Sequence, residues 1–100
     1  MTFVMVTGRF PLSKAVEIGK LFTTRKLPEV ADFVKRINIF IIADEEVKTY
    51  TLYEMPNDKL HDGIVSIGHR YAGFREIENF KYKIETLMTM KDALPMIGLG

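Results

Sequence analysis

The sequence predicts a single α+β domain built on an antiparallel sheet, and three observations lead to that prediction. Two apolar, β-branched runs, Ile37–Ala43 and Val47–Tyr53, flank the acidic turn Asp44–Glu46, which is typical of a β-hairpin. A segment with strand character and a segment with helical periodicity precede this hairpin, and one of each follows it. The length of 100 residues suits one domain with a small core.

The N-terminal part is predicted to form a strand and then a helix. The strand is placed at Phe3–Phe10, rich in Val and Phe, and is expected to end within Gly8–Pro11. Ser13 is expected to cap the helix, because its hydroxyl can accept hydrogen bonds from the next amides of the chain. Ile18 and Leu21 fall outside the expected apolar stripe, either as exposed apolar residues or as a contact with another chain. That stripe consists of Leu12, Ala15, Val16, Gly19 and Phe22.

The C-terminal part is predicted to form a second helix and a last strand. The helix is expected to start at Pro56–Asp58 and to end at Glu78–Asn79, followed by a strand at Phe80–Met88. Val65, Gly68 and Ala72 lie beside its apolar stripe and would let another element approach closely. The stripe itself consists of Leu60, Ile64, Ile67, Tyr71 and Phe74.

The last residues, 89–100, are predicted to form a short turn and a docking tail. Thr89–Asp92 resembles a capping box for one final helical turn, and Pro95 breaks it. The tail after Pro95 is apolar for a chain end, so it is expected to dock, with a neighbouring subunit as one candidate surface.

Composition narrows the expected partners and environment. The formal net charge of +1 gives no general attraction to nucleic acid or anionic lipid, and the longest apolar run, Ile39–Ala43, is far shorter than the roughly 20 residues of a membrane span. The chain has no cysteine, which removes disulfides and thiolate metal sites. His61 and His69 do not share a helical face, so no metal site is expected. A cytoplasmic protein without nucleic-acid or membrane partners is the expectation.

The element order β-α-β-β-α-β resembles the ferredoxin-like split arrangement, an antiparallel four-stranded sheet with both helices on one face. Over nearly the whole chain, element lengths resemble the dimeric α+β barrel superfamily: a short first strand at Phe3–Phe10, a long hairpin at 36–55, and a last strand that includes Glu85–Met88. The resemblance implies a homodimer or higher homo-oligomer whose paired sheets enclose a cavity. It leaves activity open among cofactor-free monooxygenases, isomerases, haem-dependent members and ligand sensors. No haem-ligand motif can be matched here, so no cofactor is expected.

Strand alternation assigns the residues of the sheet to two faces. The face opposite the helices is expected to mix charged residues with the apolar residues Phe3, Met5, Phe40, Ile42 and Leu52. A second sheet packed over this face, leaving a partly polar cavity, would explain both groups. The helix-covered face is expected to contain Val4, Val6 and Gly8; Ile37, Ile39 and Ile41; Thr49, Thr51 and Tyr53; and Phe80, Tyr82 and Ile84.

Within this cavity Arg9 is the first candidate for ligand binding. A guanidinium offers a fixed fork of donors suited to a carboxylate or a phosphate. The alternative is a salt bridge from Arg9 to Glu54 or Glu85.

Four further candidates share the predicted cavity face. Tyr50 and Asn38 can orient a ligand carbonyl or phenol, or else satisfy backbone groups. Glu85, near Lys83, can act as a general base if burial raises its pKa, or else forms an exposed pair with Lys83.

Two functions are therefore expected to compete. The first is a cofactor-independent enzyme or a small-molecule-binding protein that uses the dimer cavity. The second is a regulatory or assembly module without catalysis. In its ligand-sensing form, which resembles the ACT type, the Val6–Pro11 turn before Ser13 would hold an amino acid at a subunit interface. RNA binding is disfavoured, because the third strand lacks glycine and places Tyr50 and Tyr53 on opposite faces.

Overall fold

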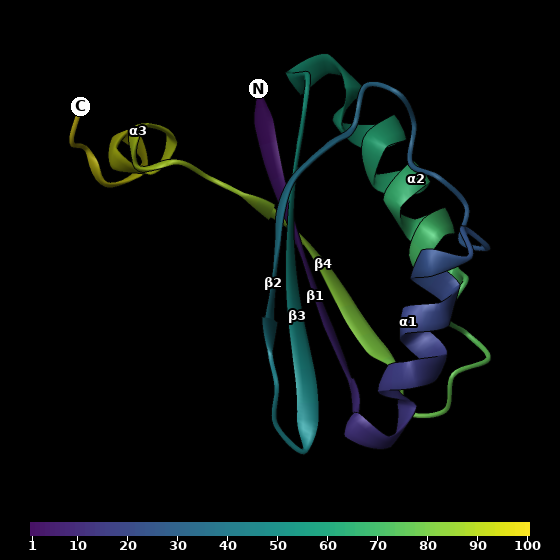
Figure 1. Cartoon of the computed structure of the whole chain (residues 1–100). Coiled ribbons are helices and arrows are strands. Elements are labelled where there is room, and N and C mark those ends of the chain that lie inside the picture. The colour runs from purple at the N-terminus through teal and green to yellow at the C-terminus, as the bar shows by residue number, and fades with distance from the viewer.

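The computed structural model describes all 100 residues and has the predicted order of strands and main helices. Four antiparallel strands form one sheet in the order β2-β3-β1-β4, and both long helices cover the same face (Figure 1). The α+β class and antiparallel sheet are thus confirmed, and the arrangement is compatible with a ferredoxin-like fold. The strands are β1 (Thr2–Pro11), β2 (Lys35–Ile42), β3 (Glu46–Met55) and β4 (Lys81–Leu87), and the helices are α1 (Ala15–Thr23), α2 (Leu60–Ala72) and α3 (Met90–Ala93).

The core lies between α2 and the two central strands, β1 and β3. The predicted stripe of α2 is confirmed, because Ile67 and Tyr71 are buried, as is Phe74 just beyond the end of the helix. They pack in one cluster with alternate residues of β1 and β3. Inside this layer the Tyr71 hydroxyl donates to Thr51 Oγ1 at 3.3 Å, which satisfies a buried polar pair. Core residues from the central strands are Val4, Val6, Phe10, Val47, Tyr53 and Met55.

The start of α1 differs from the sequence prediction. The chain enters the helix through a 3₁₀ turn at Leu12–Lys14, and Ser13 makes no capping hydrogen bond. The tighter 3₁₀ turn shifts the phase of the helix, so that Ile18 is buried while Val16 is exposed. The predicted stripe was therefore right only in part: Ala15 and Phe22 pack against the core, whereas Leu12, Val16 and Gly19 are exposed. Ile18 and Leu21, both placed outside the stripe, pack in the core as well.

Strand β1 is longer than predicted and includes the segment expected to be a turn. Its ladder with β3 continues to the pair formed by Pro11 and Glu46. Gly8 is buried inside this ladder, and a Cβ at Gly8 would lie 2.7 Å from Thr49 Oγ1. The absence of a side chain at Gly8 therefore serves strand packing, and Gly8–Pro11 is not a binding turn.

Strand β2 contributes less to the core than predicted. A bulge between Arg36 and Asn38 leaves Ile37 without a cross-strand partner, and both Ile37 and Ile41 are exposed. Burial of these two residues was predicted and is wrong, because β2 is an edge strand that α1 does not fully cover. An open apolar groove of about 460 Å³ remains between α1 and β2.

Helix α2 ends at Ala72, earlier than the predicted end at Glu78–Asn79. The following residues form turns, and Asn79 adopts a left-handed φ of 65°. A Cβ placed on Gly68 would meet no other part of the protein within 4 Å, so the close approach expected there is wrong. The close approach occurs earlier in the helix, at Gly63.

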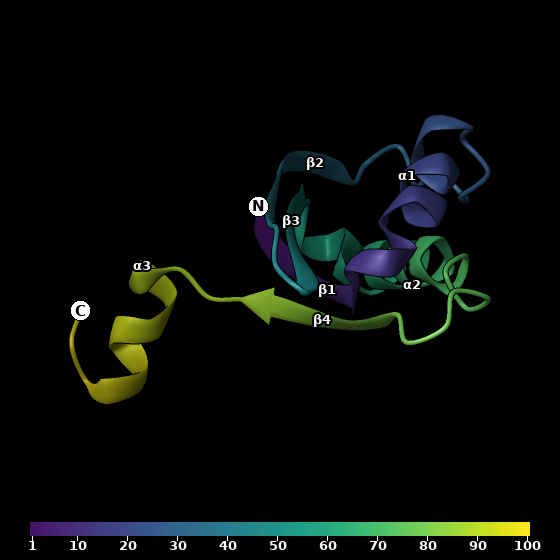
Figure 2. The same ribbon diagram turned by 60° about the horizontal axis from the view of Figure 1, so that its bottom comes forward.

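Residues 89–100 form an arm that projects from the end of β4 (Figures 1 and 2). Its predicted capping box is confirmed: Asp92 N–H donates to Thr89 Oγ1 at 3.2 Å, and Thr89 N–H donates to Asp92 Oδ2 at 3.1 Å. The hydrogen bond from the Thr89 amide lowers the pKa of Asp92. A 3₁₀ turn follows at Leu94–Ile97. None of the helices combines the length and apolar character needed to cross a membrane.

Candidate functional site

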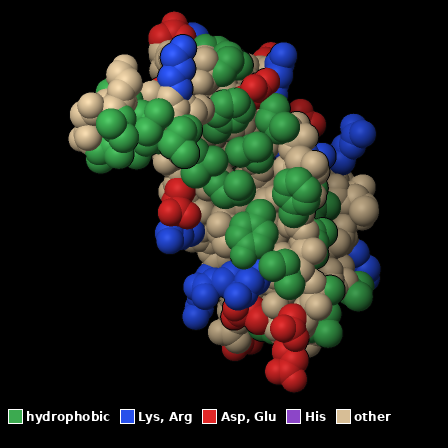
Figure 3. All heavy atoms as spheres, turned by 90° about the vertical axis from the view of Figure 1, so that its left-hand side faces the viewer, with side chains coloured by type: hydrophobic (Ala, Val, Ile, Leu, Met, Phe, Trp, Pro, Cys, Tyr) green, Lys and Arg blue, Asp and Glu red, His purple; other side chains and the backbone are tan.

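The sheet face turned away from α1 and α2, here called the open face, carries the candidate residues. Figure 3 shows this face, with hydrophobic side chains gathered over its middle and upper part and Lys and Arg side chains grouped below them. The alternation predicted from the sequence places the correct residues here, because the ladders align them in rows across the sheet. They are Phe3, Met5, Thr7 and Arg9 of β1; Lys35, Asn38, Phe40 and Ile42 of β2; Lys48, Tyr50, Leu52 and Glu54 of β3; and Lys81, Lys83, Glu85 and Leu87 of β4. Of these, Lys35 and Leu87 were not predicted.

The two ends of the open face differ in chemistry. Toward the arm, Met5 lies between Leu52 of β3 and Glu85 of β4. Toward the hairpin turn, Arg9 lies between Lys48 and Lys81. An apolar half therefore adjoins a cationic half.

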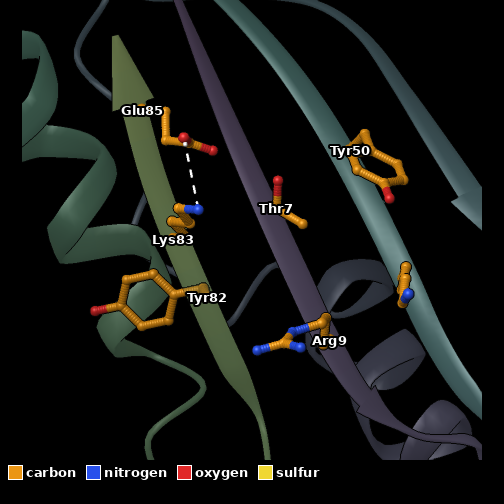
Figure 4. A pocket seen from close by; sticks show the side chains of 7 residues that line it. Thr7, Arg9, Tyr50, Tyr82, Lys83 and Glu85 are labelled. Atoms are coloured by element: carbon orange, nitrogen blue, oxygen red, sulfur yellow. Dashed lines mark ion pairs between the residues drawn. The ribbon is translucent and has the colours of Figure 1, made fainter.

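A hollow of about 290 Å³ lies where the two halves meet (Figure 4). Three cationic side chains and one carboxylate line it, which gives the hollow a positive balance suited to an anionic group. Four of the five predicted candidates, Arg9, Tyr50, Lys83 and Glu85, are brought together here. The complete lining is Thr7, Arg9, Lys48, Tyr50, Tyr82, Lys83 and Glu85.

Arg9 has a different ionic partner from those considered in the sequence. Its Nη1 lies 4.0 Å from Glu46 Oε1, at the end of the hairpin, rather than near Glu54 or Glu85. The side chains of Arg9 and Glu46 are 49% and 53% exposed, so this contact is weak. Most of the guanidinium donors of Arg9 therefore remain free for a ligand.

Glu85 is paired with Lys83 across 3.6 Å, as the dashed line in Figure 4 shows. The carboxylate side chain is 47% exposed and that of Lys83 is 71% exposed. The burial that a general base would require is thus absent from the isolated chain. The exposed pair considered as the alternative for Glu85 is the arrangement in the structure.

Tyr50 and Asn38 are placed differently from one another. Tyr50 stands between Thr7 of β1 and Phe40 of β2, so its ring joins the polar hollow to the apolar half. Asn38 lies outside the hollow, and its Oδ1 accepts a hydrogen bond from the Ile39 amide at 2.8 Å. Two roles were predicted for Asn38, and the one in the structure is hydrogen bonding to a backbone group.

Three lining residues were not predicted as candidates. Thr7 and Lys48 belong to the predicted face, but only the cross-strand register shows that they flank the hollow. Tyr82 points to the helix side, with its ring 5.5 Å from the ring of Tyr71, yet it reaches the rim because β4 is an edge strand. Strand alternation assigns Tyr82 to the helix side, so alternation alone could not reveal that Tyr82 lines the hollow.

The comparisons with known proteins give information on the fold alone. No protein-family model matches the chain, and no match was found among curated proteins. A solved structure with a similar fold is the de novo designed protein Foldit4, with a TM-score of 0.54 and 11% identity, covering 88% of this chain and 97% of that chain.

Proposed function

We propose that the chain is the subunit of a homodimer in which two open faces pack together, as in the dimeric α+β barrels that its sequence resembles. The enclosed cavity binds a small molecule that has an anionic group and an apolar body. The observation that carries this proposal is the apolar half of the open face next to the cationic hollow. The exposed pair of Lys83 and Glu85 and the free donors of Arg9 then line the cavity.

Dimer formation is supported by how little of the single chain is buried. Only 15 of the 100 residues are buried, although 47% of the residues are hydrophobic. Phe40 and Ile42 alone are 56% and 50% exposed on one face. Covering the half of each side chain that is still exposed is worth roughly 1 kcal/mol, so a second sheet on this face would be stabilised by burying such side chains together.

The arm supports the same assembly. It leaves the sheet on the side of the open face, and its Met90, Met96 and Ile97 side chains are all at least 70% exposed. A helical segment this short is unstable in water unless tertiary contacts hold it. A second copy packed on the open face would lie beside the arm and cover it.

The ligand chemistry follows from the hollow. Arg9 can hold a carboxylate through two parallel hydrogen bonds, with Lys48 and Lys83 adding positive charge. Tyr50 and Phe40 provide a flat apolar wall beside this anchor. Binding is the function that these groups support, and Glu85 is the group positioned for cofactor-independent proton transfer once a partner buries it.

The competing ACT-like function has less support. It required a turn at Val6–Pro11, and this segment is a continuous strand in which Gly8 packs against Thr49. We therefore favour the cavity of the open face as the ligand site.

The proposal is tested by native mass spectrometry followed by calorimetry. We expect a mass twice that of the 11.5 kDa chain, and saturable binding of at least one member of a panel of aromatic and aliphatic carboxylates. Arg9→Gln should weaken that binding at least tenfold and leave the dimer intact, whereas Arg75→Gln, an exposed arginine outside the hollow, should not. A monomeric wild-type protein, or equal binding by Arg9→Gln and wild type, would contradict the proposal.

A further inference from the structure

A second charged site lies on the other side of the sheet from the open face. Arg25 after α1, Arg36 in β2 and Arg70 in α2 surround two adjoining hollows of about 310 Å³ each. Both hollows are lined by Arg36, Arg70 and Glu29, and Arg25 belongs to the first of them. Three segments far apart in the sequence therefore bring guanidinium groups to one place.

Local backbone geometry directs these arginines to the hollows. Arg36 pairs with Tyr53 immediately before the β2 bulge, so it lies on the helix side of the sheet. Arg25 has a left-handed φ of 55°, which turns the chain at the end of α1. These two backbone features bring Arg25 and Arg36, both exposed to solvent, to the lining of the first hollow.

Arg70 is fixed in position by contacts with its surroundings. Its Nη1 donates to the Pro28 carbonyl oxygen at 3.1 Å, and its guanidinium lies 5.6 Å from the centre of the Phe22 ring. These contacts use part of the donor fork of Arg70, which lines both hollows, and the remaining N–H groups make no hydrogen bond within the chain.

The charge of the cluster is not balanced within the chain. Glu29 is the acidic residue that lines the hollows, and no ion pair within 4.0 Å joins it to Arg25, Arg36 or Arg70. Three cations and one carboxylate give the site a formal charge of +2. A dianionic group would neutralise this charge.

A buried hydroxyl-bearing side chain completes the second hollow. Tyr53 is 2% exposed and lines this hollow together with Arg36 and Arg70. Burial and a hydrogen bond with Tyr71 raise the pKa of Tyr53, so this phenol is engaged within the core and forms the inner wall of the hollow. The guanidinium forks of Arg36 and Arg70 beside this wall suit the oxygens of a phosphate.

We propose that this cluster binds the phosphate group of a small phosphate monoester. The phosphate would lie between Arg36 and Arg70, with Arg25 at its outer side and the organic part against Leu21 and Leu27 in the first hollow. A phosphate monoester carries a charge of about −1.5 to −2 at pH 7, which matches the formal charge of the site better than a single carboxylate does. The site uses one chain only and does not depend on the dimer cavity.

The experiment is calorimetric titration of the full chain with phenyl phosphate and with inorganic phosphate at constant ionic strength. We expect saturable binding of phenyl phosphate, and Arg25→Gln and Arg36→Gln should each weaken it at least tenfold. Glu29→Gln should tighten it severalfold, because it removes the one repulsive charge. Arg75→Gln lies outside these hollows and outside the hollow at Arg9, so it should bind like wild type.

Three outcomes would overturn this assignment. In the first, neither probe binds saturably. In the second, Arg25→Gln and Arg36→Gln bind phenyl phosphate as tightly as wild type does. In the third, Arg75→Gln loses as much affinity as they do, which would indicate general charge attraction. Urea unfolding of each variant checks that a loss of binding does not reflect a loss of folding. Failure here would leave the carboxylate site at Arg9 unaffected, because the two sites share no residue.

Discussion

Gly63 of α2 packs directly against Met55 of β3. A Cβ at Gly63 would overlap the Met55 sulfur, and it would also come within 3.4 Å of Val34 Cγ2. Met55 is completely buried, so it has little freedom to move aside. The distance between α2 and the sheet therefore depends on the missing side chain at position 63.

Two glycine substitutions on the same helix separate this packing effect from helix propensity. Each Gly→Ala change should gain about 1 kcal/mol from helix propensity alone. Gly68 has open space around it, so Gly68→Ala should raise the free energy of unfolding by about that amount. Gly63→Ala adds overpacking that costs roughly 1–3 kcal/mol, so it should be neutral or destabilising.

Urea unfolding of both variants measures the difference. The predicted order is Gly68→Ala above wild type and Gly63→Ala at or below it, with unchanged m-values. Equal stabilisation by both substitutions would mean that Met55 moves freely and that the α2–sheet contact is not tight.

The proposed dimer can be tested with two adjacent residues of β2. Phe40 points to the open face and Ile41 to the helix side, and both are more than half exposed in the single chain. Phe40→Lys should convert the dimer to a monomer, because it would bury a charge between the paired sheets. Ile41→Lys should leave the dimer intact.

Light scattering coupled to size-exclusion chromatography distinguishes the outcomes. If Ile41→Lys dissociated the protein and Phe40→Lys did not, the interface would lie at the groove between α1 and β2 instead. That groove is lined by Ile18, Ile39 and Ile41 among other apolar residues.

The sequence predicts the central strands better than the edges of the sheet. Val4 and Val6 of β1 and Thr51 and Tyr53 of β3 are buried as alternation requires, because each central strand has neighbours on both sides and a helix above it. Ile41 fails the same rule, because its burial depends on how far α1 extends over β2. How far α1 extends over β2 is set by tertiary packing, so the periodicity of the sequence does not predict it.

The candidate site was also predicted only in part. Arg9 and Tyr50 were placed on one face correctly, since strand alternation decides which face a side chain occupies. The partner of Arg9 was not predicted, because Glu46 comes near only through the extension of β1 past Phe10. Arg25 and Arg70 meet through loop geometry, and no local pattern could indicate that they are neighbours.

The arm is predicted to be protected only in the dimer. The main-chain hydrogen bonds within residues 89–99 close the short helical turns, but none of residues 89–100 is buried. Hydrogen exchange should therefore be slower at the amides of Asp92, Ala93 and Leu99 in wild type than in the monomeric Phe40→Lys variant. Identical exchange in the two proteins would show that the arm does not lie against the second copy.

Tyr53 should make the stability of the protein fall at alkaline pH. Burial is the main cause of its raised pKa, with Tyr71 adding to the effect, whereas Arg70 and Arg36 oppose it. In the unfolded chain a tyrosine ionises near pH 10, while the folded chain keeps Tyr53 protonated above that value. The stabilising contribution is therefore complete below pH 10 and is lost above it, at about 1.4 kcal/mol per pH unit.

Tyr53→Phe removes this titration and keeps the ring in the core. Urea unfolding at pH 8 and pH 11 should show a smaller loss of unfolding free energy for Tyr53→Phe than for wild type, because phenylalanine has no proton to release in either state. Each protein is compared with itself at the two pH values, so the effect of the missing hydroxyl on the unfolding free energy at neutral pH drops out. An identical alkaline loss in both proteins would mean that the phenol of Tyr53 titrates in the folded chain as it does in the unfolded one.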